Sequence, residues 1–230
     1  MRLLLQKIII ITLLDILSLA AGDLYVFAPT FSKTNTVEKE LISHSTSGTV
    51  KVFGRFSDFK AMIEATPPDV LVAPAETIRF LGLSDKIRLR GIVKGQLFEP
   101  MVLVSMDHGL DKAKWPESSI GYVATADRAE GKRLLESRLG IKTGANPTTK
   151  LEDLLPLLTF QSAQAVLVSA SQAAQFKQRS QANLVLQPVA DAKQETMVVV
   201  LLNETGKGFL NDMMRLPQSS LELLSVEGWK

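Results

Sequence analysis

The chain has 230 residues, of which 46% are hydrophobic and 22% are charged. This composition predicts a packed core and excludes a disordered chain, and the length suits one large domain or two small ones. The formal net charge of +2 is too balanced for a nucleic-acid partner, because phosphates favour a concentrated basic face. The chain has no cysteine, and its only histidines are His44 and His108. This excludes disulfides and thiolate chemistry and argues against a metal site, so we expect no cofactor.

The N-terminal segment has the order of parts found in a secretory signal peptide. Two basic residues precede an apolar run over residues 8–19, and small residues follow at 20–22. The run is shorter than the roughly 20 residues of a membrane-spanning helix, and Asp15 within it disfavours both interpretations. We expect export to the periplasm with cleavage after Ala20 or Gly22, and an uncleaved N-terminal membrane tether is the alternative.

Strand-like and helix-like segments alternate along the rest of the chain, in two series. The expected elements of the first series are strands at 24–28, 50–53 and 69–73, with helices starting near 37, 56 and 76. In this series Asn35 and Glu38 have the spacing of a capping box. The expected elements of the second series are strands at 120–124 and 165–168, and helices at 126–139, 151–160 and 171–179. A helical region over 208–224 closes the chain. Such alternation predicts βαβ units.

Two long extended stretches, near residues 90–105 and 184–203, join the two series. A chain that leaves one lobe by a strand and returns by a strand has a two-strand hinge and a cleft between the lobes. We therefore predict an α/β protein with two lobes, each a mainly parallel sheet flanked by helices. The predicted boundaries are a signal peptide at 1–22, the first part of lobe 1 at 23–99, lobe 2 at 100–190 and a return to lobe 1 at 191–230.

The order of these elements resembles that of the type 2 periplasmic solute-binding proteins, in particular the phosphate and phosphonate branch of ABC-transporter receptors. The resemblance extends over residues 23–229 and is carried by the segments Asp69–Pro74, Phe98–Val104, Ile120–Thr125, Gln164–Val168 and Leu216–Trp229. The chain departs from that branch at 124–130, where a run rich in serine and threonine is replaced by a segment with one hydroxyl and two carboxylates.

Ligands of two-lobed α/β proteins lie beyond the carboxyl ends of strands, close to helix N-termini whose free N–H groups suit anions. Four loops and the hinge meet this description. The ligand-binding candidates are Thr30, Ser32, Lys33, Ala75, Glu76, Thr77, Phe98, Glu99, Thr125, Asp127, Arg128 and Ser169. Structural roles compete with these assignments: Asp127 and Ser169 also suit helix caps, and Arg128 also suits an exposed surface.

No catalytic motif is present in the sequence, so we expect no enzyme. The resemblance implies a receptor that captures a small anionic solute, phosphate-like, phosphonate-like or a carboxylate, between its lobes for an ABC importer. Its expected partners are the solute and an inner-membrane permease or sensor protein, and we expect a monomer. The alternative is a sensor or envelope interaction module built on the same fold, without transport.

Overall fold

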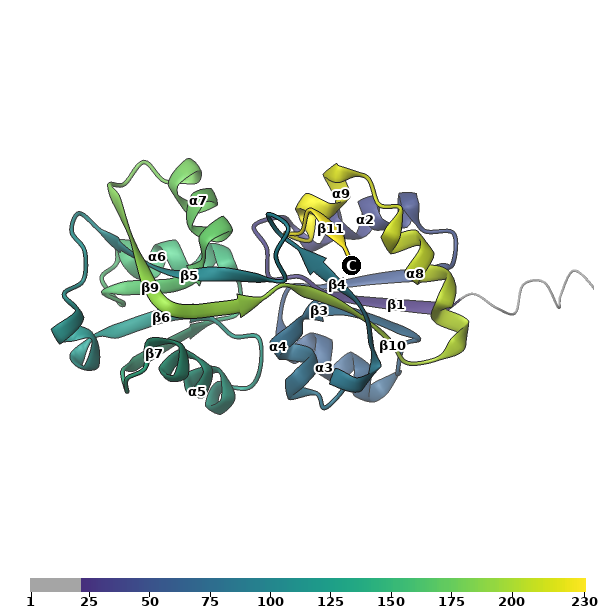
Figure 1. Cartoon of the computed structure of the whole chain (residues 1–230), viewed down its shortest axis with the longest axis horizontal. Coiled ribbons are helices and arrows are strands. Elements are labelled where there is room, and N and C mark those ends of the chain that lie inside the picture. The colour runs from purple at the N-terminus through teal and green to yellow at the C-terminus, as the bar shows by residue number, and fades with distance from the viewer. Residues whose placement is uncertain (1–21) are drawn as a thin grey trace, which may run out of the picture.

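The structure is a computed structural model that describes residues 22–230 (Figure 1). Two lobes, each built on one sheet, lie side by side, and extended strands pass between them. The expected signal peptide lies outside the described residues, apart from Gly22, which begins the first strand. Within residues 22–230, no helix has the length and apolar character needed to cross a membrane.

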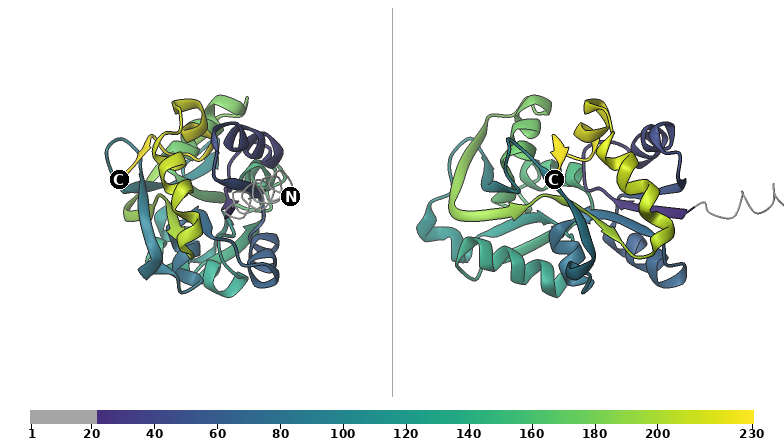
Figure 2. Two further views of the ribbon diagram at one scale, coloured as in Figure 1. Left: turned by 90° about the vertical axis from the view of Figure 1, so that its right-hand side faces the viewer. Right: turned by 45° about the vertical axis from the view of Figure 1, so that its right-hand side comes forward.

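The first lobe contains a six-stranded sheet in the order β11-β4-β10-β3-β1-β2. Its strands are β1 (Gly22–Phe27), β2 (Gly48–Phe53), β3 (Val70–Pro74), β4 (Ile87–Ile92), β10 (Met197–Leu201) and β11 (Gly228–Trp229). Its helices are α2 (Thr34–His44), α3 (Phe56–Ala65), α4 (Ala75–Phe80), α8 (Lys207–Met214) and α9 (Gln218–Leu223). The chain ends beside β4, where the backbones of Arg90 and Lys230 exchange two hydrogen bonds of 2.8 Å (Figure 2).

The second lobe contains a five-stranded sheet in the order β7-β6-β8-β5-β9. Its strands are β5 (Phe98–Met106), β6 (Ser119–Val123), β7 (Gly144–Thr148), β8 (Ala165–Ser169) and β9 (Leu184–Glu195). Its helices are α5 (Arg128–Leu139), α6 (Leu154–Thr159) and α7 (Ala170–Arg179). Short 3₁₀ helices complete both lobes at 84–86, 112–117, 151–153 and 204–206.

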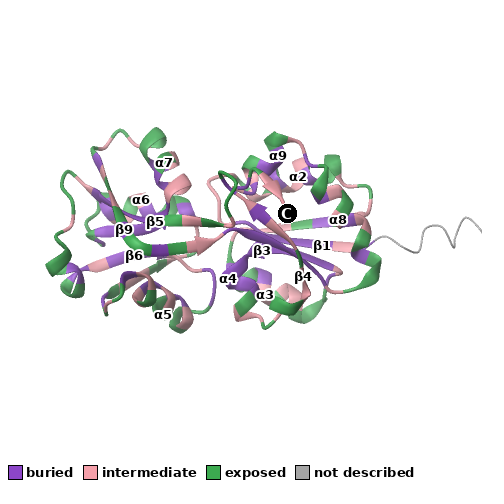
Figure 3. Ribbon diagram, in the orientation of Figure 1, coloured by how far each residue is buried: buried purple, intermediate pink, exposed green. Residues whose placement is uncertain are grey.

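The central strands are apolar on both faces because helices cover both sides of each sheet. In β1, Leu24 and Val26 pack towards α2, α8 and α9, whereas Tyr25 and Phe27 pack towards α3 and α4. These strands form the buried centre of each lobe in Figure 3. The apolar runs that predicted strands in the sequence are therefore the cores of the two lobes.

The strands β5 and β9 form the two-strand crossing. Phe98 pairs with Glu195 and Glu99 with Gln194 where the strands leave the first lobe. Between β9 and β10, Thr196 is buried, and its hydroxyl donates a 2.5 Å hydrogen bond to the carbonyl of Gly91. The predicted two-lobed α/β fold with a two-strand hinge is thus confirmed.

The sheets differ in one respect from the sequence prediction, because each is mixed and not mainly parallel. The pairs expected from βα units are parallel, as in β1 with β2 and β3 and in β6 with β7 and β8. The strands that carry the chain between the lobes pair antiparallel to their neighbours. The chain leaves the first lobe through β5 and returns to it through β9, so these two strands run in opposite directions.

The start of α2 also differs from the prediction. The helix begins at Thr34, and the residue at its N-cap position is Lys33, which makes no side-chain capping bond. The predicted cap at Asn35 is therefore wrong. The Glu38 carboxylate reaches instead to the neighbouring strand, where it accepts a 3.0 Å hydrogen bond from the Val52 N–H. The first turn of α2 holds no acidic residue, so its N–H end keeps a positive potential.

Candidate functional site

The loops that follow β1, β3, β6 and β8 meet between the two lobes, at the carboxyl ends of their strands. Ligands of open α/β sheets bind at such edges. Most of the candidate residues line the space between the lobes or bond across it. Those on this interface are Thr30, Ser32, Lys33, Glu76, Thr77, Phe98, Glu99, Thr125, Asp127 and Ser169.

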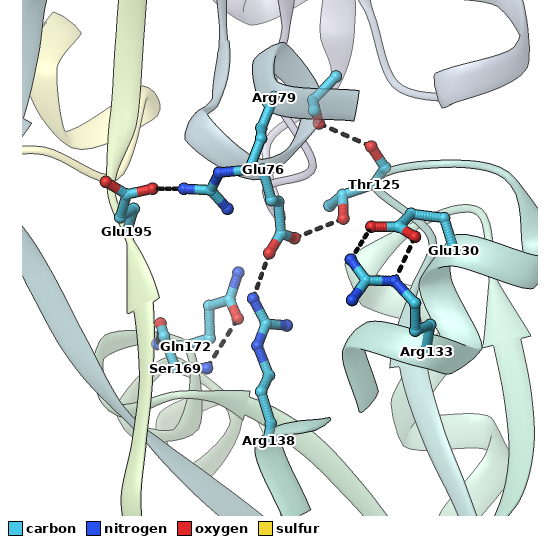
Figure 4. A network of polar contacts seen from close by, with 10 residues as sticks. Glu76, Arg79, Thr125, Glu130, Arg133, Arg138, Ser169, Gln172 and Glu195 are labelled. Carbon is cyan, nitrogen blue, oxygen red and sulfur yellow. Dashed lines mark hydrogen bonds and ion pairs between the residues drawn. The ribbon is translucent and has the colours of Figure 1, made fainter. Parts of the chain in front are cut away.

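The middle of this interface is filled by protein side chains. The hydroxyl of Thr77 in the first lobe donates a 2.7 Å hydrogen bond to the carbonyl of Thr125 in the second, and both residues are buried. The Glu76 carboxylate, only 6% exposed, accepts a hydrogen bond from the Thr125 hydroxyl and pairs with Arg138 of α5 (Figure 4). The lobes are therefore in direct polar contact at the N-terminal end of α4.

A second contact joins the lobes through the loop after β1. The Phe31 ring packs edge-on against Phe176 of α7, with ring centroids 5.0 Å apart and an interplanar angle of 85°. The Arg179 guanidinium lies 4.7 Å from the centre of the Phe31 ring. Phe31 thus belongs to the first lobe in sequence but packs against the apolar core of the second.

Near the hinge, the Glu99 carboxylate accepts a 3.2 Å hydrogen bond from the Ser171 N–H at the start of α7. The Ser169 hydroxyl accepts from the Gln172 N–H at 3.4 Å, and the Gln172 side chain accepts from the Ser169 N–H at 3.0 Å. This reciprocal pair is a capping box, the structural role expected of Ser169. A narrow gap of about 40 Å³ separates these residues from Thr30.

A cavity whose lining carries a net positive charge lies beside the loop after β1. It has a volume of about 490 Å³, and its polar lining includes Thr30, Ser32 and Lys33 from the first lobe and Lys150 from the second. Lys33 is exposed and forms no ion pair within residues 22–230. The Lys150 ammonium lies 3.3 Å from the Glu152 carboxylate. Both side chains are exposed to solvent, so this ion pair is weak. Two ammonium groups therefore flank this cavity from opposite lobes.

A cavity of about 620 Å³ lies on the hinge side of α4 and α5. Its lining includes Phe98, Arg79 and Lys193, and the Arg79 guanidinium pairs with Glu195 (Figure 4). The Glu195 carboxylate also lies 3.3 Å from Arg90. The charged side chains of its lining balance, three basic against three acidic, whereas the cavity beside Lys33 has two basic and one acidic. This cavity therefore carries less net positive charge than the cavity beside Lys33.

Asp127 and Arg128 stand at the start of α5. The Asp127 carboxylate accepts a 2.8 Å hydrogen bond from the Glu130 N–H, so it caps the helix, and it also borders a cavity of about 420 Å³ next to α3. Arg128 is exposed and is not among the residues that line the cavities described above. Ala75 is buried at the first position of α4. Ligand roles for these residues stay predictions.

Two titratable groups near this helix start have shifted pKa values. Burial raises the pKa of Tyr122, whose hydroxyl has no hydrogen-bond partner among the described residues. Hydrogen bonds from Arg133, at 2.5 and 2.6 Å, lower the pKa of Glu130. Both groups therefore keep their ordinary charge states at neutral pH, and neither is poised for proton transfer there.

The interface residues that sequence reasoning missed include Phe31, Arg138 and Lys150. Phe31 carries the one aromatic ring between the predicted strand at 24–28 and the helix predicted to start near 37, which is a usable signal. Arg138 stands on the last turn of a predicted helix, a common place for a basic residue that interacts with the helix dipole. Only the packing of one lobe against the other shows that it reaches Glu76.

No known family and no curated protein matches this sequence. Solved structures do match. The VFT2 domain of Bordetella pertussis BvgS, a double mutant, gives a TM-score of 0.60 at 11% identity, covering 90% of this chain and 93% of that one. The GluR0 ligand-binding core of Nostoc punctiforme in complex with L-glutamate gives 0.55 at 10% identity, covering 89% and 95%.

The substrate binding protein of an amino acid ABC transporter gives a TM-score of 0.55 at 10% identity, covering 89% of this chain and 92% of that one. Likeness at such identities establishes the fold alone, which is the two-lobed fold of the type 2 periplasmic binding proteins. These neighbours give no support to the phosphate and phosphonate branch that the sequence resembled.

Proposed function

We propose that this protein is an extracytoplasmic receptor module that captures a small anionic solute between its lobes and catalyses no reaction. The observation that carries the proposal is the cavity of about 490 Å³ flanked by Lys33 of one lobe and Lys150 of the other. This volume falls in the range of about 300–1,000 Å³ that is usual for small-molecule sites. An anion between two ammonium groups favours the closed lobes, because only that state brings both charges to it.

The chemistry of this cavity suits a carboxylate. Thr30 and Ser32 supply hydroxyls, and the first turn of α2, which holds no acidic residue, supplies N–H groups. The one carboxylate among the lining residues is Glu152, which is paired with Lys150. A phosphate-like anion would use the same donors. The similar structures favour the carboxylate class, since one of them holds L-glutamate and another serves an amino acid transporter.

The partner on the membrane is an ABC permease or a sensor protein. Delivery to a permease is supported by the likeness to a transporter's substrate binding protein. The sensor alternative has its own support, because the lobes already contact each other through Thr77, Glu76 and Phe31. A likeness to the periplasmic VFT2 domain of BvgS points the same way.

Thermal unfolding in the presence of amino acids, other small carboxylates, phosphate and phosphonates tests the proposal. A solute at a hundredfold excess over its Kd stabilises by about 2.7 kcal/mol, which raises the Tm by about 5–10 °C for a chain of this size. In the variant with both Lys33→Ala and Lys150→Ala, we expect the affinity for the active solute to fall more than tenfold.

The matched control is Lys39→Ala, which removes an exposed lysine of α2 that does not line the cavity. This variant should keep the wild-type affinity. A panel in which no solute shifts the Tm would refute the receptor proposal. If a solute binds and its affinity does not change in the variant that lacks both lysines, its binding site lies outside this cavity.

A further inference from the structure

We propose that Glu76 is a built-in carboxylate ligand of the cleft, which holds the two lobes together when no solute is present. The Glu76 side chain leaves α4 of the first lobe, and both of its oxygens are bound by groups of the second lobe. The proposal concerns the closing of the lobes and does not depend on which solute binds beside Lys33.

The surroundings of Glu76 are those of a bound anion. One carboxylate oxygen accepts from the Thr125 hydroxyl, and the other is paired with the Arg138 guanidinium (Figure 4). Only 6% of Glu76 is exposed, and Arg138 is 19% exposed. A hydroxyl and a guanidinium converging on a shielded carboxylate are how a receptor would hold a carboxylate solute. Here the carboxylate is supplied by the protein.

The neighbouring Thr77–Thr125 hydrogen bond fixes the same contact. Its length of 2.7 Å brings the start of α4 directly against the loop before α5, so the space between them is filled. Thr77 is fully buried and Thr125 is 5% exposed. Opening the lobes would break this bond and both bonds of Glu76, and water would have to replace every one of them.

A different kind of contact supports the closed lobes on the opposite side of the interface. There Phe31 packs against Phe176, and Arg179 covers its ring. The two contacts differ in chemistry, since one is a shielded ion pair and the other an aromatic cluster. Together they join the loop after β1 to α7 and join α4 to α5.

This arrangement changes what a solute can do. A ligand shifts an equilibrium only by the difference between its affinities for the two states. If the lobes are already closed, a solute that prefers the closed state adds little further closure, whereas a solute that prefers the open state would release the contact. In this proposal the contacts of Glu76, Thr77 and Phe31 make the closed state the resting state of the protein.

Chemical rescue tests the role of Glu76. The variant Glu76→Ala leaves the Thr125 hydroxyl and Arg138 without their acceptor, and we expect a larger radius of gyration in solution scattering and a Tm lower by about 10 °C. Added acetate should fill the vacated place, contract the protein and raise its Tm with increasing concentration. Acetamide has the same shape without the charge and should have no such effect.

The controls separate a specific site from a general salt effect. The double variant Glu76→Ala with Arg138→Ala should not respond to acetate, because the guanidinium is gone. Glu136→Ala removes a glutamate–lysine pair within α5, so it should leave the radius of gyration unchanged. Glu76→Gln keeps the side-chain shape and should open the lobes only in part, which provides a test if the alanine variant is unstable.

Two results would overturn the proposal. The first is a radius of gyration that is the same in wild type, Glu76→Ala and Glu76→Gln. The second is an acetate response of equal size in the wild type, the single variant and the double variant. Neither result bears on solute binding beside Lys33 and Lys150, so this proposal and the proposed function can fail separately.

Discussion

Substitution of Phe31 by alanine should open the lobes without unfolding either of them. The ring makes one edge-to-face aromatic contact, worth about 0.5–1.5 kcal/mol, and one contact with the Arg179 guanidinium, worth about 0.5–1 kcal/mol. Phe31 is partly exposed, so the burial of its ring adds only a little to these values. We expect the closed state to lose about 2 kcal/mol, which raises the ratio of open to closed molecules about thirtyfold.

Fluorescence energy transfer between the lobes measures that ratio. The chain contains no cysteine, so two introduced thiols can be labelled without removing native ones. Ser43→Cys on α2 and Gln178→Cys on α7 place both labels at exposed positions in different lobes. Phe31→Ala should lower the transfer efficiency relative to the parent. Phe160→Ala removes a ring that is 78% exposed and should leave it unchanged. Equal efficiencies in the parent and Phe31→Ala would refute the reasoning.

The remaining predictions concern stability. Burial raises the pKa of Asp69, but hydrogen bonds from the Thr205 hydroxyl and the Asp23 N–H outweigh it and hold this pKa below its ordinary value. Because its pKa is lower in the folded state, ionised Asp69 stabilises the fold at pH values above its unfolded pKa of about 4. This stabilisation is lost as the pH falls through the folded-state pKa. Asp69→Asn should therefore lower the Tm at neutral pH and have little effect in strong acid, and equal losses at both would contradict this assignment. Gly140 ends α5 with a φ of +70° and has no neighbouring atom within 4 Å of an added Cβ. Gly140→Ala should cost about 1 kcal/mol in urea unfolding through backbone strain alone, and an unchanged or increased stability would contradict it.

The two-lobed fold could be predicted because its signals are local. Runs such as Val70–Ala73 are short, rich in valine and apolar at every position, which is typical of a strand covered on both faces. The strand β7 could not be predicted in this way. It pairs with β6 at the edge of the sheet, and its sequence, Gly-Ala-Asn-Pro-Thr, has little strand propensity. The antiparallel pairs of β5 and β9 depend on the path between the lobes, which the apolar pattern does not encode.

The candidate site could be predicted in part for a similar reason. The rule that ligands lie beyond strand ends located Thr30, Thr77 and Thr125, which are now found at the interface. It could not reveal that Glu76 binds across the cleft to Arg138, 62 residues further along the chain. Contacts between lobes depend on how the lobes dock, and no spacing within one helix records that geometry.

Solution scattering from wild-type protein freed of any co-purified solute tests the central claim most directly. The protein would be unfolded in denaturant, dialysed and refolded before measurement, with no solute added. The account predicts the scattering profile calculated for closed lobes, since the contacts of Glu76 and Phe31 hold them together without a solute. An expanded profile that contracts only after a solute is added would contradict it.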